Sequence, residues 1–223
     1  MSFFKIGTTL FNDNYTFLDT TIIMTTADEH KIAMQALQAE QKKKVKAAEH
    51  SETGLVLVHT GNGKGKSSSA FGVAARALGW GHQVAVVQFI KGTWKTGERE
   101  FFNRFPEQLH WHTMGEGFTW NTQDRDQDIA AATNAFEQAT QSMQSGDYDL
   151  VVLDEINIAL RYDYLDVDDI ISGLQARSDR TSVILTGRDA KPALMDMADL
   201  VTEMKEIKHP FQSGIKAKQG IDF

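Results

Sequence analysis

Short apolar runs alternate with segments of helical character from residue 54 onward. Strands are predicted over residues 55–60, 83–90, 109–114, 150–155, 182–187 and 200–207. Helices are predicted between them, over residues 66–78, 122–145, 166–177 and 191–198. Strands that read as unbroken runs of valine, isoleucine and leucine are buried on both faces, and their alternation with helices is typical of a parallel sheet. We therefore expect an α/β fold, with a mainly parallel sheet and helices on both of its faces.

The first fifty residues have a different character. Residues 1–23 are rich in threonine and phenylalanine without periodicity, so we expect a loosely ordered extension, or a stretch upstream of a second possible start at Met24. Residues 24–53 predict a helical arm, because they are rich in helix formers but poor in apolar side chains. That helix is either simply solvated or lies over something anionic through the lysines of Lys42–Lys46. The α/β domain is expected over residues 54–223.

Composition narrows the classes of function. The chain has 223 residues with 41% apolar and 24% charged residues, which is ordinary for a globular protein. Its net charge of −7 disfavours sequence-independent binding to nucleic acid. The lack of cysteine excludes thiolate catalysis, cysteine zinc sites and iron–sulfur clusters, and it fits a reducing compartment. The sequence offers no membrane-spanning run and a poor signal peptide, so we expect a cytoplasmic protein that binds neither nucleic acid nor membrane.

The junction between the first strand and the following helix reads HTGNGKGKSSSAFG, which ends as a Walker A sequence does. Its glycines permit positive φ and leave room for phosphate oxygens, while the helix start directs free N–H groups at an anion. Lys66 supplies a positive charge and Ser67 a hydroxyl for Mg²⁺. The pattern departs from the general one in that Thr60 stands where the first glycine is usual. The predicted nucleotide-binding residues are Gly61, Asn62, Gly63, Lys64, Gly65, Lys66, Ser67 and Ser68.

A second nucleotide motif, LVVLDE, follows 88 residues after Lys66. A parallel strand that ends in an acid brings Asp154 beside the metal of the phosphate loop, as in the Walker B arrangement. Glu155 either orients an attacking water or simply places charge at a helix N-terminus. The predicted metal ligands are thus Ser67, Asp154 and Glu155, and the two motifs on this sheet predict a P-loop NTPase-like (RecA-like) fold that binds a magnesium nucleotide.

An aromatic pair lies in the segment GEGFTWNT, at the end of the third predicted strand. Loops at this end of a parallel sheet line the ligand crevice, which makes Phe118 and Trp120 candidates for ligand contact. Packing in the core is the other interpretation of the two side chains.

These motifs together resemble one family. The segments TGNGKGKSSSAFG, VVQFIKGTW, GFTW, VVLDE and LTGR, followed by the tail KHPFQSGIKAKQGIDF, are similar in type and order to the ATP:corrinoid adenosyltransferase family (cob(I)yrinic acid a,c-diamide adenosyltransferase). The likeness runs over about residues 50–223, includes the threonine at position 60, and extends to the polar N-terminal helix.

The resemblance implies a reaction and its participants. A Co(I) corrinoid attacks the 5′ carbon of ATP and expels inorganic triphosphate, in adenosylcobalamin synthesis or salvage. The residues implied as catalytic are Lys66, Phe118 and Trp120, with the two aromatics at the lower face of the corrinoid, where they displace its lower ligand. Mg²⁺ (or Mn²⁺) would neutralise the triphosphate, and Glu155 would help to organise that metal without activating water. The family further implies a homodimer, an N-terminal helix that reaches toward an active site, and a reduced flavoprotein as electron donor.

Two other classes of function remain open on the Walker motifs alone. A motor-type ATPase related to RecA is favoured by the pair Asp154 and Glu155, and would release ADP and phosphate. A nucleoside kinase would instead phosphorylate an acceptor. Neither class accounts for GFTW or the C-terminal tail.

Overall fold

The computed structural model describes residues 27–48, 51, 53–90, 96–114 and 124–222. The chain divides into two compact units, residues 1–50 and 51–223. In the first unit the predicted polar helix is present as α1 (Ala27–Ala47), and its side chains from His30 onward are exposed. An ion pair between Glu40 and Lys44, 2.8 Å long and four residues apart, supports this solvated helix. No helix in the described ranges has the length and apolar character needed to cross a membrane.

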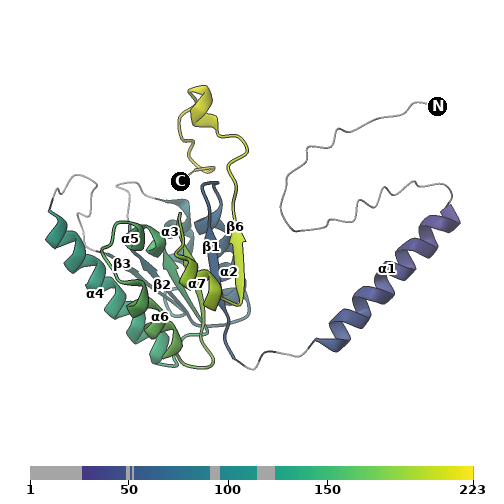
Figure 1. Cartoon of the computed structure of the whole chain (residues 1–223), viewed down its shortest axis with the longest axis horizontal. Helices are drawn as coiled ribbons and strands as arrows, with labels where there is room; N and C mark the ends of the chain where they lie inside the picture. Colours follow the sequence, from purple (N-terminus) through teal and green to yellow (C-terminus); the bar gives the residue numbers. More distant parts are fainter. Residues whose placement is uncertain (1–26, 49–50, 52, 91–95, 115–123, 223) are drawn as a thin grey trace. The chain divides into compact units, whose positions relative to one another are not determined.

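The second unit is built on a six-stranded sheet in which every ladder is parallel, with the strand order β3-β2-β4-β5-β1-β6 (Figure 1). The strands are β1 (Val56–Thr60), β2 (Val84–Gln88), β3 (Leu109–Thr113), β4 (Leu150–Asp154), β5 (Ser182–Thr186) and β6 (Leu200–Glu203). The predicted parallel sheet is therefore confirmed. Only the last strand is clearly shorter than expected, since it ends at Glu203 and not near residue 207.

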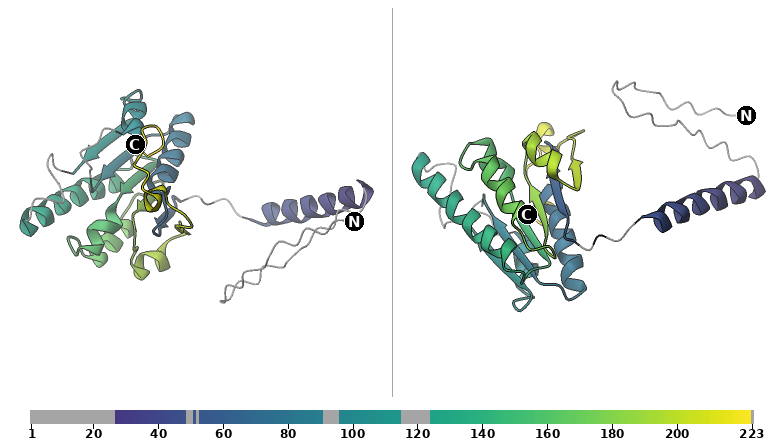
Figure 2. Two further views of the ribbon diagram at one scale, coloured as in Figure 1. Left: turned by 90° about the horizontal axis from the view of Figure 1, so that it is seen from above. Right: turned by 60° about the horizontal axis from the view of Figure 1, so that its bottom comes forward.

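Helices cover both faces of the sheet (Figures 1 and 2). One face carries α2 (Lys66–Gly79) and α3 (Gly97–Phe102), and the other carries α4 (Arg125–Gln144), α5 (Ile156–Arg161), α6 (Val167–Gln175) and α7 (Pro192–Met197). Successive residues of a strand enter opposite layers of core: Val86 packs with α2 and α3, whereas Val87 packs with the second group of helices. Burial on both faces explains why these strands read as unbroken apolar runs.

Some short elements were not expected from the sequence. The helices α3 and α5 have six residues each, too few for a helical period to show. A 3₁₀ turn, η1 (Pro210–Ser213), lies within the C-terminal tail. The helix expected from residue 122 begins at Arg125, because the side chain of Asp124 caps it by accepting from the N–H of Gln127, and Thr122 lies outside the described residues.

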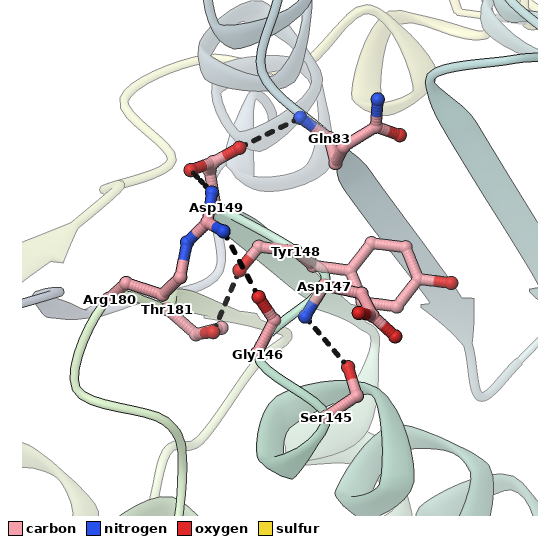
Figure 3. A network of polar contacts seen from close by, with 8 residues as sticks. All are labelled: Gln83, Ser145, Gly146, Asp147, Tyr148, Asp149, Arg180 and Thr181. Carbon is pink, nitrogen blue, oxygen red and sulfur yellow. Dashed lines mark hydrogen bonds and ion pairs between the residues drawn. The ribbon is translucent and has the colours of Figure 1, made fainter.

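The amino ends and the carboxyl ends of the strands have different roles: the first hold the sheet together and the second are available to ligands. At the edge where β2, β4 and β5 begin, the Asp149 carboxylate accepts from the Gln83 N–H at 2.9 Å and pairs with Arg180 (Figure 3). Arg180 also donates to the carbonyl of Gly146 at 3.1 Å, and the Thr181 hydroxyl donates to that of Tyr148 at 2.7 Å (Figure 3). These contacts tie neighbouring strand starts together. The carboxyl ends of the strands meet at the opposite edge, where parallel sheets bind ligands.

Candidate nucleotide site

The phosphate loop occupies residues 61–65, between β1 and α2. Gly61 and Gly65 have φ angles of +95° and +107°, in the left-handed region that glycine tolerates best. Gly65 is the N-cap of α2, and a Cβ built on it would meet no atom within 4 Å. The loop therefore delivers an open helix N-terminus, which is the part of a helix that attracts anions.

Close packing against the segment after β6 constrains Gly61 and Gly63. The Gly63 N–H donates to the carbonyl of Met204 at 2.7 Å. A Cβ on Gly61 would lie 2.4 Å from the Met204 oxygen, and one on Gly63 would lie 2.8 Å from the carbonyl carbon of Lys205. The sequence suggested that the glycines make room for phosphate oxygens. The structure shows that Gly61 and Gly63 make room for the protein's own backbone at Met204 and Lys205, which supports the loop.

Lys66 opens α2 and is almost fully buried, with 7% of its surface exposed. Its ammonium donates to the carbonyl of Gly63 at 2.6 Å. Burial lowers the pKa of Lys66, more than the nearby carboxylate of Glu155 raises it. A bound anion would offset the cost of burying the charged ammonium, because an opposite charge nearby favours the ionised form.

Asp154 ends β4 and is 2% exposed. Its two oxygens are held separately: the Thr186 hydroxyl donates to Oδ1 at 2.9 Å and the Gln88 side-chain amide to Oδ2 at 3.0 Å. Ser67 also hydrogen-bonds this carboxylate. Burial raises the pKa of Asp154 in spite of these three donors. A cation bound beside this carboxylate would offset the cost of burying its ionised form.

Glu155 follows directly, in an unusual backbone conformation with φ +62°. Its N–H donates to the same Thr186 hydroxyl oxygen at 2.9 Å, which supports that conformation. Burial, and then the charge of Asp154, raise the pKa of Glu155 to about 7. Its position as N-cap of α5 agrees with the interpretation that it places charge at a helix start.

A cavity of about 400 Å³ collects most of the predicted nucleotide residues. Its lining includes Gly63, Lys64, Gly65, Lys66, Ser67, Ser68, Asp154 and Glu155. Gly61 and Asn62 are not in the lining, and Phe118 and Trp120 lie outside the described residues. A second cavity, of about 660 Å³, lies between α4 and α6 and is lined by none of the predicted residues. It is therefore not the candidate nucleotide site, although it is larger.

Other side chains that line the cavity, or that hold Asp154 as Thr186 does, were missed from the sequence. Gln88 and Thr186 are polar residues that end buried strands, a signal that could have been used. Asp222 gave no such signal, because its ion pair with Lys64 joins residues 158 positions apart. Arg188 was not missed, since the sequence marked it through the motif LTGR, but without an assigned role; it lines the cavity just after β5.

The donor set fits Mg²⁺ or Mn²⁺. Among the residues that the structure describes, no three His, Asp or Glu side chains come together as a metal cluster. Ions of this kind in nucleotide sites are bound by one or two carboxylates, a hydroxyl, water and the phosphates themselves. Ser67 and Asp154 are a hydroxyl and a carboxylate of the kinds that such a shell uses.

Comparison with known proteins agrees with this geometry. The model of the family ATP:corrinoid adenosyltransferase BtuR/CobO/CobP matches residues 52–223. The chain is 53% identical over 194 residues to the corrinoid adenosyltransferase of Pseudomonas aeruginosa, covering 87% of this chain and 95% of that protein. It is 45% identical over 177 residues to the corrinoid adenosyltransferase CobA of Salmonella typhimurium, covering 79% and 89%.

Among solved structures, the flagellar accessory protein FlaH of Methanocaldococcus jannaschii superposes with a TM-score of 0.46 at 12% identity, over 68% of this chain and 71% of that one. The match of the family model across the whole sheet and phosphate loop is far more specific. This protein is therefore an enzyme that belongs to the ATP:corrinoid adenosyltransferase family.

Proposed function

We propose that this enzyme holds the triphosphate of ATP in its phosphate loop as an intact leaving group. As a member of its family, the chain transfers the 5′-deoxyadenosyl group of ATP to the Co(I) centre of a corrinoid, in adenosylcobalamin synthesis or salvage. The electron pair of Co(I) forms the cobalt–carbon bond while the C5′–O bond breaks, and the bonding pair leaves on triphosphate. The observation that carries the proposal is the single cavity in which Lys66, Ser67 and Asp154 meet at the start of α2.

Charge neutralisation is the main task of the protein in this reaction, since the leaving group gains negative charge as the bond breaks. The open N-terminus of α2 and the ammonium of Lys66 would bind the phosphates, and Arg188 lies at the same cavity. Ser67 and Asp154 would hold Mg²⁺ or Mn²⁺, which supplies further positive charge at the phosphate oxygens. The corrinoid is itself the nucleophile, so the protein needs none of its own.

Glu155 would help to organise the metal without activating water. The support is its place: Glu155 follows Asp154 directly and lines the same cavity as Lys66 and Ser67. Its backbone N–H is also bound to Thr186, which helps to fix the residue's backbone next to Asp154. A triphosphate that must leave intact is protected by a site without an activated water.

The corrinoid half of the site rests on the resemblance. Phe118 and Trp120 belong to the segment that follows β3, and β3 ends at the same edge of the sheet as the phosphate loop. They would lie against the lower face of the corrinoid and displace its lower ligand, which makes the cobalt easier to reduce to Co(I). A reduced flavoprotein would supply the electron. The enzyme would act as a cytoplasmic homodimer, and the helical arm that contains α1 and the lysines of Lys42–Lys46 would reach toward an active site.

Trp120→Ala should cripple turnover when a weak biological reductant must generate Co(I), yet recover most activity when Co(I) is made chemically beforehand. The reason is that the ring would act on the reduction step and not at the 5′ carbon. The measurement is the ratio of the two assays, with Phe118→Ala alongside. Equal losses in both assays, together with a lower melting temperature, would mean that these aromatic side chains pack in the core. Truncating a buried Trp there lowers the free energy of unfolding by about 3–5 kcal/mol.

Product analysis tests the reaction as a whole. The purified enzyme is incubated with ATP, Mg²⁺ and chemically reduced cobalamin, and the expected products are inorganic triphosphate and a corrinoid with a cobalt–carbon bond. Release of ADP and phosphate would instead identify a motor-type ATPase. A phosphorylated acceptor would identify a kinase.

A further inference from the structure

Thr60 is the one residue of the phosphate-loop motif that departs from the general pattern, and the structure gives it a specific partner. Its hydroxyl oxygen accepts a hydrogen bond from the backbone N–H of Ala190 at 3.0 Å. The side chain is buried, with 7% of its surface exposed. Thr60 ends β1, and Ala190 follows the adjacent strand β5, so this bond joins the base of the phosphate loop to a second loop 130 residues away.

That second loop, residues 187–190, has a backbone that needs outside support. Gly187 has φ +127°, and Asp189, which is not a glycine, has φ +57°. Left-handed conformations of non-glycine residues cost free energy and persist only where surrounding contacts impose them. Arg188 lies between these two residues, and its direction is therefore set by the strained loop.

Two buried polar side chains hold the ends of this loop. At one end the fully buried Asn157 donates from its side-chain amide to the carbonyl of Gly187 at 3.2 Å. The contact is close, because a Cβ on Gly187 would lie 2.8 Å from the Cβ of Asn157. At the other end Thr60 accepts from Ala190. The loop is thereby fixed to α5 and to β1 at once.

Arg188 is the residue of this loop that faces the nucleotide cavity. It lines the nucleotide cavity together with Lys66 and Glu155, and its charge acts on the pKa of both. A guanidinium in this place suits the oxygens of a polyphosphate, which it can bind with two parallel hydrogen bonds.

We propose that Thr60 is a positioning residue: through Ala190 it fixes the loop that directs Arg188 at the triphosphate of ATP. The proposal rests on the proposed function, because triphosphate is the ligand it assigns to Arg188. A glycine at position 60, as in the general pattern, would leave the Ala190 N–H without this acceptor.

The experiment is a double-mutant cycle between Thr60 and Arg188. Thr60→Val removes the acceptor at nearly constant shape, and Thr60→Ser retains it. The KM for ATP and the inhibition constant of inorganic triphosphate are measured with Co(I) generated chemically, and the melting temperature is recorded for each variant. We expect Thr60→Val to raise both constants about tenfold and Thr60→Ser to stay near the parent. In the Arg188→Ala background, Thr60→Val should add less than about twofold, because its effect is transmitted through Arg188.

A matched control separates positioning from ordinary stability. Thr181 is likewise a buried threonine, and its hydroxyl donates to a backbone group, the carbonyl of Tyr148, at the opposite end of the strands. Thr181→Val should lower the melting temperature without changing triphosphate inhibition. If Thr60→Val does not fold, Thr60→Ala replaces it, since the smaller side chain admits a water to the Ala190 N–H.

Additive effects in the cycle would overturn the proposal, and so would unchanged triphosphate inhibition in Arg188→Ala. Either result leaves the reaction itself intact as long as triphosphate is still released. Failure to release triphosphate from ATP is the separate outcome that would refute the proposed function.

Discussion

Lys66→Ala is expected to reduce kcat/KM for ATP by about two to three orders of magnitude, the cost typical of removing one preorganised group that stabilises transition-state charge. Lys66 begins the helix that opens into the nucleotide cavity. Its ammonium is already desolvated and bonded only to a loop carbonyl in the contacts described, at 2.6 Å from Gly63. Burial lowers its pKa, which means that the charge is costly in the free enzyme. The melting temperature of the variant should therefore not fall.

Two further variants isolate the charge. Lys66→Met keeps most of the aliphatic stem, and it should lose as much activity as Lys66→Ala if the ammonium is what matters. Arg76→Ala removes a positive charge from the exposed surface in the last turn of the same helix and should leave kcat/KM within about twofold. The assay is single-turnover formation of the cobalt–carbon bond with excess Co(I) corrinoid. Near-normal kcat/KM in Lys66→Ala would refute the assignment of the phosphate loop.

Much of the fold followed from local sequence, because its strands are buried on both faces. Runs such as LVVLDE and SVILTG, alternating with helices, are typical of a covered parallel sheet, and β4 and β5 are found there. The elements that were missed lack this property. The six residues of α3 and of α5 are too short for periodicity, and α5 continues the apolar run of β4.

The same contrast between local and distant information applies to the site. Lys66, Ser67 and Asp154 could be identified because each has its role from a short motif within one strand-to-helix junction or strand end. The contacts that hold these residues come from distant parts of the sequence. Thr186, 32 positions away, hydrogen-bonds Asp154, and the backbone of Met204, which follows β6, supports the phosphate loop. Strand order decides such neighbours, and the sequence did not predict it. The departure from the general motif at Thr60 was visible in the sequence, but its hydrogen-bond partner, the N–H of Ala190, is 130 residues away.

The position of β5 gives these distant contacts one physical source. In the sheet β5 lies between β1, which leads into the phosphate loop, and β4, which ends in Asp154. The carboxyl end of β5 therefore touches both halves of the site. Its last residue, Thr186, bonds Asp154 and the backbone of Glu155, while the loop that follows it carries Arg188 and is tied to Thr60. The strand between the two motifs sets the geometry of both.

Asp154→Asn is expected to reduce kcat/KM by about two to three orders of magnitude while leaving the metal-free protein at least as stable as the parent. The shape of the side chain is kept. The Gln88 amide can rotate to offer its oxygen to the new Asn nitrogen, and the Thr186 hydroxyl can continue to donate, so the buried group stays hydrogen-bonded. What disappears is a buried negative charge, and with it the anionic partner of the metal.

The dependence of stability on pH checks this explanation. Burial raises the pKa of Asp154 above its value in the unfolded chain, so the folded protein loses stability as the pH rises and the carboxylate must ionise. The asparagine variant is free of that loss. Its advantage in melting temperature over the parent should therefore be absent below the unfolded-state pKa of aspartate, at about pH 4. The advantage should grow as the pH rises through the raised pKa of the folded state and level off above it. Thermal unfolding in the absence of divalent metal, at a series of pH values, measures it, with activity assayed in parallel at saturating Mg²⁺. A variant that is inactive but less stable at every pH would mean that Asp154 serves the fold through its hydrogen bonds and that the metal site lies elsewhere.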